Sequence, residues 1–270
     1  MSGDAGGGRN VVLGVNDLPA DGDVSHDLAA PVRALAVGAH PDDIEFGCGA
    51  TVAKWSAAGC EVFHLVLTDG AKGTWDPGAD RDALVALRQA EARAAAAALG
   101  SSEVFFLGRT DGELENTAAE RWEVSRLIRT LRPAVVLGHD PWRRYRLHPD
   151  HRHAGFIVTD ALVAARDPLF FPDQGLAPHR PEALLLWEAD QPNHVESVSG
   201  FETAKVAGLL AHESQHETTL GIPAGTAAAA AAAARDEAVA GFRVRVVAQL
   251  QAHGHLGGVA LGESFHLVAV

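Results

Sequence analysis

The pattern of apolar and polar positions predicts alternating strands and helices from Pro31 onward. Short apolar runs, typical of buried strands, occupy residues 33–38, 61–68, 104–107, 134–138 and 182–188. Longer amphipathic segments, typical of helices, occupy residues 47–59, 82–99, 119–131, 151–165, 201–212 and 227–252. This alternation predicts an α/β fold: a Rossmann-like, mostly parallel sheet with helices on both faces.

Both ends of the chain differ from this pattern. Residues 1–30 are rich in Gly, Asp and Asn and predict an arm, in which the apolar residues 11–13 could dock onto the rest. Thr226 is a good N-cap for the alanine run at 227–234. The last residues, 264–270, predict an extended tail. We therefore expect a single domain over residues 31–270.

The composition excludes several classes of protein. The formal net charge of −13 argues against nucleic acid or an anionic membrane surface as the main partner. No apolar run approaches the roughly 18 residues of a membrane-spanning helix. The N-terminus lacks a basic segment followed by an apolar one, and there are only two cysteines, Cys48 and Cys60. We therefore expect a cytoplasmic protein with reduced thiols.

The first group of chemistry-bearing residues follows the strand at 33–38 and reads His40-Pro41-Asp42-Asp43. Because Pro41 stiffens the turn, and His40 and Asp43 are three positions apart, one turn can direct both side chains at one point. A converging imidazole and carboxylate suit zinc or another borderline divalent cation. Asp42 would then be free to act as a base. An Asp-rich turn that caps the next helix is an equal alternative.

A second group, His148-Pro149-Asp150-His151, follows the strand at 134–138 after a polar loop and opens a helix. The spacing alone does not say which histidine would bind a metal, and a histidine-rich surface loop is the alternative. The carboxyl ends of parallel strands meet at one edge of the sheet, where ligands bind in such folds. Three ligands from the two groups would leave an open fourth position, the pattern of a catalytic zinc site.

These motifs, in this order, resemble the LmbE/PIG-L family of zinc-dependent de-N-acetylases. The similarity rests on AVGAHPDDIEFGCGAT, LTDGAKGT and HPDHRHAG, with an Arg…Glu pair at 88–91, and runs from about Ala34 to Ala165. A weaker similarity covers residues 210–215 and the sequence ESFH near the carboxyl terminus. A nucleotide-binding Rossmann protein is disfavoured, because the first loop carries HPDD in place of GxGxxG.

The resemblance implies a function for each residue of the two groups. Three of them match the family's zinc ligands, for one zinc per chain: His40, Asp43 and His151. Asp42 matches its general base, which would accept a proton from water activated by zinc. His148 matches the histidine that stabilises the oxyanion and helps to protonate the leaving amine, and Asp150 matches the residue that orients it. The sequence does not decide whether Asp42 or His148 protonates the amine.

Three further residues are weaker candidates for contact with substrate. Arg146 stands where some relatives have a tyrosine, with Tyr145 beside it. Its guanidinium could serve the oxyanion or an anionic substrate group, or could simply be solvated. Asp69 follows the strand at 61–68 and could line the cleft or cap a turn. His266 resembles a carboxyl-terminal histidine that reaches a neighbouring subunit's site in hexameric relatives, so we expect a homo-oligomer; a surface histidine is the alternative.

Another pair of histidines suggests a metal site less strongly. His212 and His216 are four positions apart, but the residues between them do not form an HExxH motif. We therefore expect both on the surface of a helix.

The sequence thus predicts a zinc-dependent enzyme that removes acetate from an acetamide on an N-acetylated amino sugar or a sugar-containing small molecule. One alternative is an amidase that cleaves a thiol-cofactor conjugate. The other is a non-catalytic protein that binds zinc or sugar. The sequence does not select the substrate.

Overall fold

The computed structural model describes residues 24–223 and 229–270, and these residues form one eight-stranded sheet with the order β1-β7-β8-β6-β5-β2-β3-β4. The strands are β1 (Ser25–His26), β2 (Arg33–Gly38), β3 (Glu61–Thr68), β4 (Glu103–Arg109), β5 (Val135–His139), β6 (Ala183–Trp187), β7 (His194–Ser197) and β8 (Gly262–Ala269). β8 is antiparallel to its neighbours β6 and β7, and the other paired strands are parallel. The predicted mostly parallel sheet is confirmed.

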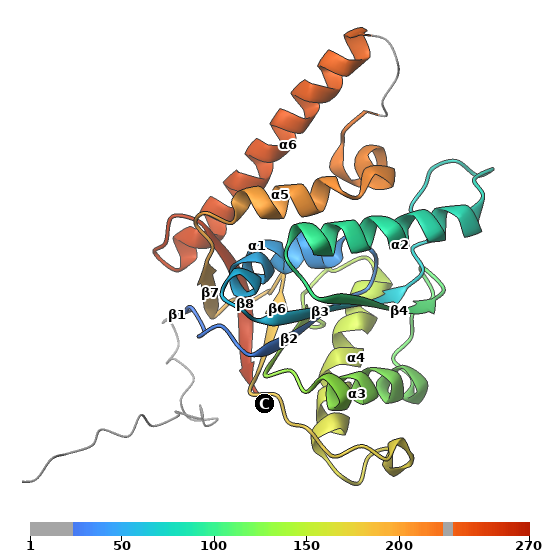
Figure 1. Cartoon of the computed structure of the whole chain (residues 1–270), viewed down its shortest axis with the longest axis vertical. Coiled ribbons are helices and arrows are strands. Elements are labelled where there is room, and N and C mark those ends of the chain that lie inside the picture. The colour runs from blue at the N-terminus through green and yellow to red at the C-terminus, as the bar shows by residue number, and fades with distance from the viewer. Residues whose placement is uncertain (1–23, 224–228) are drawn as a thin grey trace, which may run out of the picture.

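Helices cover both faces of the sheet, as Figure 1 shows. They are α1 (Asp43–Ala57), α2 (Arg81–Ala98), α3 (Ala118–Leu131), α4 (Pro149–Arg166), α5 (Glu202–Leu210) and α6 (Ala229–Leu256). Three shorter helical segments are η1 (Pro172–Gln174), η2 (Glu213–Gln215) and the π-helical turn η3 (His216–Leu220). α1, α2, α5 and α6 lie on one face, and α3 and α4 on the other.

Strand β2 shows how the sequence pattern builds both layers. Successive side chains of a strand point to opposite faces. Ala34 and Ala36 pack into the core beneath α1, whereas Leu35 and Val37 pack into the core beneath α4. An uninterrupted apolar run is therefore what a strand buried on both faces requires.

Helix α1 is interrupted at Cys48, whose φ of −147° is not helical. The buried carboxylate of Glu263, on β8, accepts hydrogen bonds from the backbone N–H groups of Ala50 (3.1 Å) and Thr51 (2.7 Å) beyond the interruption. Lys205 of α5 pairs with the same carboxylate at 2.6 Å. The interruption therefore leaves neither the freed N–H groups nor the buried charge without a partner.

Several predicted boundaries differ from the structure. Ser25–His26, within the arm predicted at 1–30, pair with β7. The residues predicted as a tail, 264–270, belong largely to β8 inside the sheet, and β7 itself was not predicted. Residues 11–13 and Thr226 lie outside the described residues.

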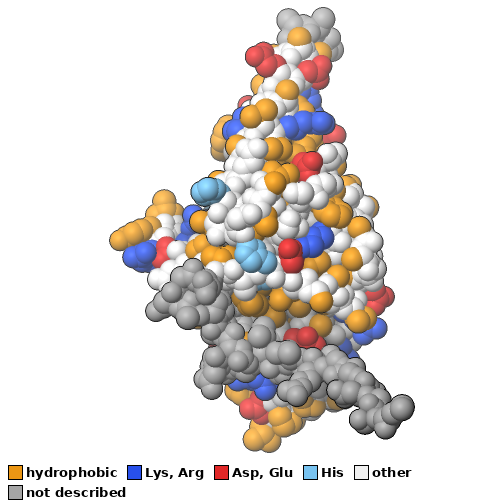
Figure 2. All heavy atoms as spheres, turned by 90° about the vertical axis from the view of Figure 1, so that its left-hand side faces the viewer, with side chains coloured by type: hydrophobic (Ala, Val, Ile, Leu, Met, Phe, Trp, Pro, Cys, Tyr) orange, Lys and Arg blue, Asp and Glu red, His pale blue; other side chains and the backbone are white. Residues whose placement is uncertain are grey.

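The described part of the chain has no helix that is long and apolar enough to cross a membrane. Figure 2 shows the face on the side of β1 and α6. Where described residues are visible on this face, Lys and Arg side chains are interspersed with acidic ones and form no continuous basic patch. This distribution agrees with the acidic composition.

A reversal in strand order positions the site. β3 and β4 lie on one side of β2, and β5 and β6 lie on the other. The helices that follow β2 and β5, α1 and α4, consequently cover opposite faces. In open α/β sheets a crevice forms at such a point, beyond the carboxyl ends of the strands. The two histidine–aspartate motifs follow these two strands.

Candidate active site

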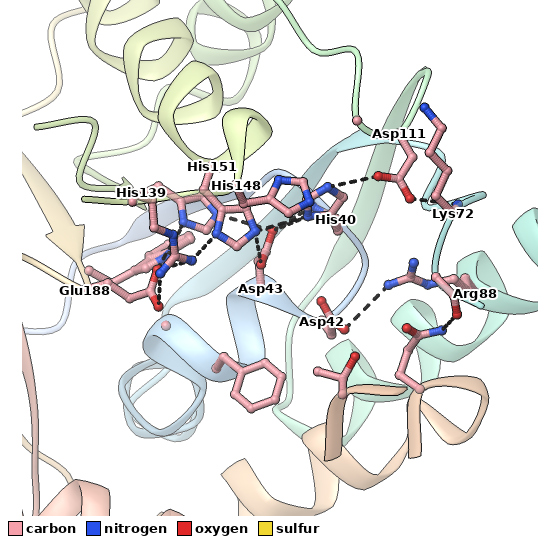
Figure 3. A pocket seen from close by; sticks show the side chains of 18 of the residues that line it. His40, Asp42, Asp43, Lys72, Arg88, Asp111, His139, His148, His151 and Glu188 are labelled. Atoms are coloured by element: carbon pink, nitrogen blue, oxygen red, sulfur yellow. Dashed lines mark hydrogen bonds and ion pairs between the residues drawn. The ribbon is translucent and has the colours of Figure 1, made fainter. Parts of the chain in front are cut away.

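A cavity of about 450 Å³ lies at the carboxyl ends of β2 and β5. Its lining comes from the β2–α1 turn, the end of β5, the start of α4 and the end of β6, so both motifs contribute to it. The volume is within the range of small-molecule sites. Figure 3 shows the histidines gathered beside the start of α4, with Asp43 pointing toward them.

The turn after β2 separates its two aspartates. The Asp43 carboxylate accepts a hydrogen bond from the His40 backbone N–H (2.7 Å), and Asp43 begins α1, ahead of the predicted start at residue 47. Asp42 has a φ of 120°, a conformation that is strained for a residue with a Cβ atom. The turn directs Asp43 toward the histidines and Asp42 toward Arg88, as Figure 3 shows.

Three residues from the two motifs, His40, Asp43 and His151, form a donor triangle, to which Asp43 contributes both carboxylate oxygens. His40 Nδ1 lies 3.4 Å from Asp43 Oδ2, His151 Nε2 lies 3.2 Å from Asp43 Oδ1, and the two ring nitrogens are 3.2 Å apart. Tetrahedral zinc with ligand distances of about 2.0–2.1 Å separates neighbouring ligand atoms by about 3.3 Å. The triangle therefore fits such an ion. Three other trios also lie within reach of one ion: Asp43–His139–His151, His40–His148–His151 and His40–Asp111–Asp150.

Two carboxylates hold the other ring nitrogen of His40. His40 Nε2 lies 3.1 Å from Asp150 Oδ2 and 3.3 Å from Asp111 Oδ1. Asp150 also accepts hydrogen bonds from the N–H groups of Gly112 (2.6 Å) and Leu114 (3.2 Å). A proton on Nε2 leaves the Nδ1 lone pair free for a metal, an arrangement common behind metal-binding histidines. Asp150, which the resemblance pairs with His148, thus orients His40 in this structure.

Asp42 is buried beside a cation. Its Oδ2 atom lies 3.5 Å from Arg88 Nη2, and the Arg88 guanidinium donates hydrogen bonds to the carbonyl oxygens of Pro41 (2.7 Å) and Gly70 (2.8 Å). Burial raises the pKa of Asp42 to about 6. The positive charge of Arg88 lowers this pKa, whereas the negative charge of Asp43 raises it. A carboxylate with a pKa close to neutral is suited to act as a general base.

Two more histidines lie next to the triangle. His148 is the exposed N-cap residue of α4, and its ring centroid lies 4.6 Å from that of His40. Partial burial and the charge of His40 lower the pKa of His148.

His139, at the end of β5, is a site residue that the sequence analysis did not identify. Its Nε2 lies 3.2 Å from Asp43 Oδ2, and its Nδ1 accepts a hydrogen bond from Trp187 Nε1 (3.0 Å). The one feature of the sequence that could have suggested His139 as a site residue is its position at the end of a strand.

Arg146 lines the cavity with its charge already paired. Its two terminal nitrogens lie 2.8 and 2.6 Å from the two carboxylate oxygens of Glu188, and it also contacts His151 Nδ1. Burial would raise the pKa of Glu188, but His139 and Arg146 lower it to about 2. Arg146 is therefore not the solvated loop arginine that was one of the predicted alternatives. Its neighbour Tyr145 faces solvent and is 92% exposed.

Two predicted contact residues lie outside the cavity lining. Asp69 Oδ1 accepts hydrogen bonds from the N–H groups of Ala71 (2.9 Å) and Asp111 (3.1 Å), so it caps a turn. His266 lies on β8 with its Nδ1 2.6 Å from the carbonyl oxygen of Gln191. Its contact with a neighbouring subunit's site stays a prediction.

The expectation that His212 and His216 lie on a helix surface is wrong, because both are buried. α5 ends at Leu210, and the chain continues into η2 and η3, which turn both side chains inward. His212 Nε2 lies 3.2 Å from Glu45 Oε2, and His216 Nε2 lies 2.9 Å from the carbonyl oxygen of Leu210.

The family model of GlcNAc-PI de-N-acetylases, PIG-L, matches residues 35–162. The chain is also 37% identical over 186 residues to diacetylchitobiose deacetylase from Thermococcus kodakarensis, a match that covers 68% of this chain and 70% of that protein. The chain belongs to the PIG-L (LmbE-like) family.

Other PIG-L-like proteins extend this similarity. A 1D-myo-inositol 2-acetamido-2-deoxy-alpha-D-glucopyranoside deacetylase from Actinosynnema mirum is 36% identical over 163 residues, which cover 51% of this chain and a little over half, 57%, of that protein. The structure of N,N′-diacetylchitobiose deacetylase from Pyrococcus horikoshii has a TM-score of 0.77 and 27% identity, and covers 88% of this chain and 84% of that one. The predicted family and fold are confirmed, and these relatives are named as deacetylases.

Proposed function

We propose that this PIG-L family enzyme hydrolyses the acetamide of an N-acetylated amino sugar, or of a small molecule that contains one, and releases acetate and a free amine. One observation supports this most: the donor triangle of His40, Asp43 and His151 shares a cavity with the Asp42 carboxylate. Metal ligands and a separate base in one cavity suit hydrolysis of an amide.

The proposal includes one zinc ion per chain, held by His40 Nδ1, Asp43 and His151 Nε2. A zinc ion in such a site supplies a Lewis acid that activates water and polarises a carbonyl. Burial lowers the pKa of His151 to about 3, despite the opposing charge of Asp43. The His151 ring is therefore neutral near pH 7, as a metal-binding histidine must be. Burial lowers the pKa of His40 as well, but Asp111, Asp150 and Asp43 raise it well above its usual value, so a metal at His40 Nδ1 would displace a proton.

The chain's own residues then move the protons. Asp42 accepts a proton from the water that attacks the acetamide carbon. His148, which also lines the cavity, donates a hydrogen bond to the carbonyl oxygen as that oxygen gains negative charge. The carbon–nitrogen bond breaks when the amine nitrogen receives a proton, which Asp42 returns or His148 supplies.

Acetate release from defined substrates tests the proposal. Zinc-loaded protein is incubated with N-acetylglucosamine, N,N′-diacetylchitobiose and N-acetylglucosaminyl inositol, and acetate and amine are quantified by mass spectrometry. We expect equal amounts of both products, loss of activity on chelation, and recovery when zinc is returned. Asp42→Asn protein, prepared in parallel, controls for a contaminating hydrolase. Zinc-loaded protein that releases acetate from none of the three would contradict the proposal.

A further inference from the structure

His139 and Trp187 form a buried pair beside the donor triangle. His139 ends β5, Trp187 ends β6, and the two residues are direct partners in the parallel register of these strands. Their rings meet edge to face, with centroids 4.9 Å apart, and both side chains are buried. A Cβ atom on Gly47 of α1 would lie 2.5 Å from the indole ring, so α1 packs directly on Trp187. The two strands and α1 therefore hold the pair in one arrangement.

The indole of Trp187 determines which nitrogen of His139 carries the proton. Trp187 Nε1 lies 3.0 Å from His139 Nδ1, and an indole N–H can only donate. Because a proton on Nδ1 would face the indole N–H, His139 carries its proton on Nε2. Glu188 Oε2 is 3.7 Å from Nδ1, too far to accept a hydrogen bond from it. The Ala39 N–H faces Nε2 at 3.4 Å, but this longer contact is weaker than the bond from the indole.

A proton on His139 Nε2 is directed at one oxygen of Asp43. Nε2 lies 3.2 Å from Asp43 Oδ2, within the distance of an N–H···O hydrogen bond (Figure 3). The same oxygen accepts the backbone N–H of His40 at 2.7 Å, so two donors on different strand ends hold it. The other oxygen, Oδ1, lies 3.2 Å from His151 Nε2. The two donors thus keep the carboxylate turned with Oδ1 toward His151.

We propose that His139 is a positioning residue: its Nε2–H fixes the Asp43 carboxylate for metal binding, and Trp187 fixes the tautomer that makes this possible. A protonated Nε2 has no lone pair for a metal, so His139 does not complete the trio with Asp43 and His151 as a ligand. Carboxylates that bind metals are commonly held by hydrogen bonds in this way. This inference rests on the proposed zinc-dependent function and names the residues that support one of the zinc ligands.

Three variants separate positioning from ligation. His139→Leu removes the donor, His139→Gln keeps an amide N–H near the place of Nε2, and Trp187→Phe removes the indole N–H while a ring stays beneath α1. Competition with a chromophoric chelator measures the zinc affinity of the full chain. We expect it to fall about 10- to 100-fold in His139→Leu, and about 2- to 12-fold in Trp187→Phe, the factor for one neutral hydrogen bond. His139→Gln should stay closer to the wild type than His139→Leu. The visible spectrum of the Co²⁺-loaded protein, which reports on ligand geometry, should change in His139→Leu and be restored in His139→Gln.

Trp122→Phe provides the matched control, because Trp122 Nε1 donates a hydrogen bond to Asp173 Oδ2 (2.8 Å) outside the cavity lining. It should keep the wild-type zinc affinity, and thermal unfolding verifies that each variant is folded. Equal losses in His139→Gln and His139→Leu would identify His139 as a ligand and overturn the inference. Wild-type affinity in His139→Leu would also overturn it, as would equal affinities in Trp187→Phe and Trp122→Phe, a comparison that holds even if His139→Leu does not fold. These outcomes leave deacetylation by the wild type standing, whereas a wild type that binds no zinc would refute the proposed metal site and the inference with it.

Discussion

At the scale of single residues, Asp42 and Asp43 are adjacent in sequence but have different surroundings. Asp43 faces His139 and His151, whereas Asp42 faces Arg88. Burial raises the pKa of both carboxyls, but His151 and His139 bring that of Asp43 well below its usual range, while that of Asp42 rises to about 6. Different surroundings thus suit one carboxylate to bind a metal and the other to act as a base.

Asp42→Asn keeps the shape of the side chain and removes the base. We expect kcat to fall about 10²- to 10⁴-fold, the usual contribution of general base catalysis. Zinc content should be unchanged, because Asp43 rather than Asp42 faces the other donors. Acetate release and elemental analysis measure the two effects. The exposed Asp82 of α2 supplies the control, since Asp82→Asn should alter neither. Near-wild-type turnover in Asp42→Asn would exclude this residue as the base.

Asp150→Asn tests the support of His40. The buried carboxylate accepts three hydrogen bonds, from His40, Gly112 and Leu114, and an amide cannot accept all of them equally well. We expect zinc affinity to fall about 10- to 100-fold, as for other residues that orient metal ligands. Competition with a chromophoric chelator measures it. His151→Ala, which removes a proposed ligand, should weaken binding further. Wild-type affinity in Asp150→Asn would show that this carboxylate does not support the metal.

At the scale of elements, the site depends on the packing of α4 against the end of β5. α4 begins at Pro149, whose missing N–H is not needed in a first helical turn. Gly155, one turn beyond the motif, lies so close to β5 that a Cβ atom there would be 2.6 Å from the carbonyl oxygen of His139 and 2.8 Å from Pro141 N. This close approach places His151 beside His139.

Gly155→Ala should destabilise the protein by about 1–3 kcal/mol, because the added methyl group meets backbone atoms that must move. It should also weaken zinc binding by shifting α4. Gly241 of α6 is the matched control: a Cβ atom there would be 3.7 Å from Arg245 Nη1, an ordinary contact. Gly241→Ala should stabilise the helix by about 0.5–1 kcal/mol. Urea unfolding compares the two, and changes of the same sign would contradict this explanation.

At the scale of the whole molecule, the sheet determines which distant segments meet. Ala34 of β2 is paired with Val135 of β5, so the two motifs become neighbours. β8 lies between β6 and β7, so the carboxyl-terminal residues belong to the sheet. Phe265 is buried in the core, and His266 points to the opposite side of β8, partly exposed.

We expect a homo-oligomer in which His266 of one subunit reaches the cavity of another. Because His266 does not line the cavity of its own chain, its loss should affect kcat only through such a contact. His266→Ala should lower kcat roughly tenfold or more, within the range for a group that assists proton transfer, with oligomer and zinc content intact. The exposed His255 of α6 offers His255→Ala as a control. Light scattering that finds a monomer, or an unchanged kcat, would contradict this prediction.

The sequence by itself determined the succession of strands and helices and the two motifs at strand ends. Both features are local: a strand buried on two faces needs an unbroken apolar run, and a surface helix needs its own periodicity. The edge at which the motifs meet also follows, because parallel strands share their carboxyl ends. The resemblance to the PIG-L family then assigned the chemistry.

Only the tertiary structure decided which side chains act on one another. Asp150 contacts His40, and His139 and Asp111 join the site, because the ends of β5 and β4 bring them to the end of β2. His212 turns inward to Glu45, 167 positions earlier in the chain, where the local pattern predicted a helix surface. A hydrogen bond between distant residues leaves no mark on the periodicity around either partner, so such pairings appear only once the elements have packed.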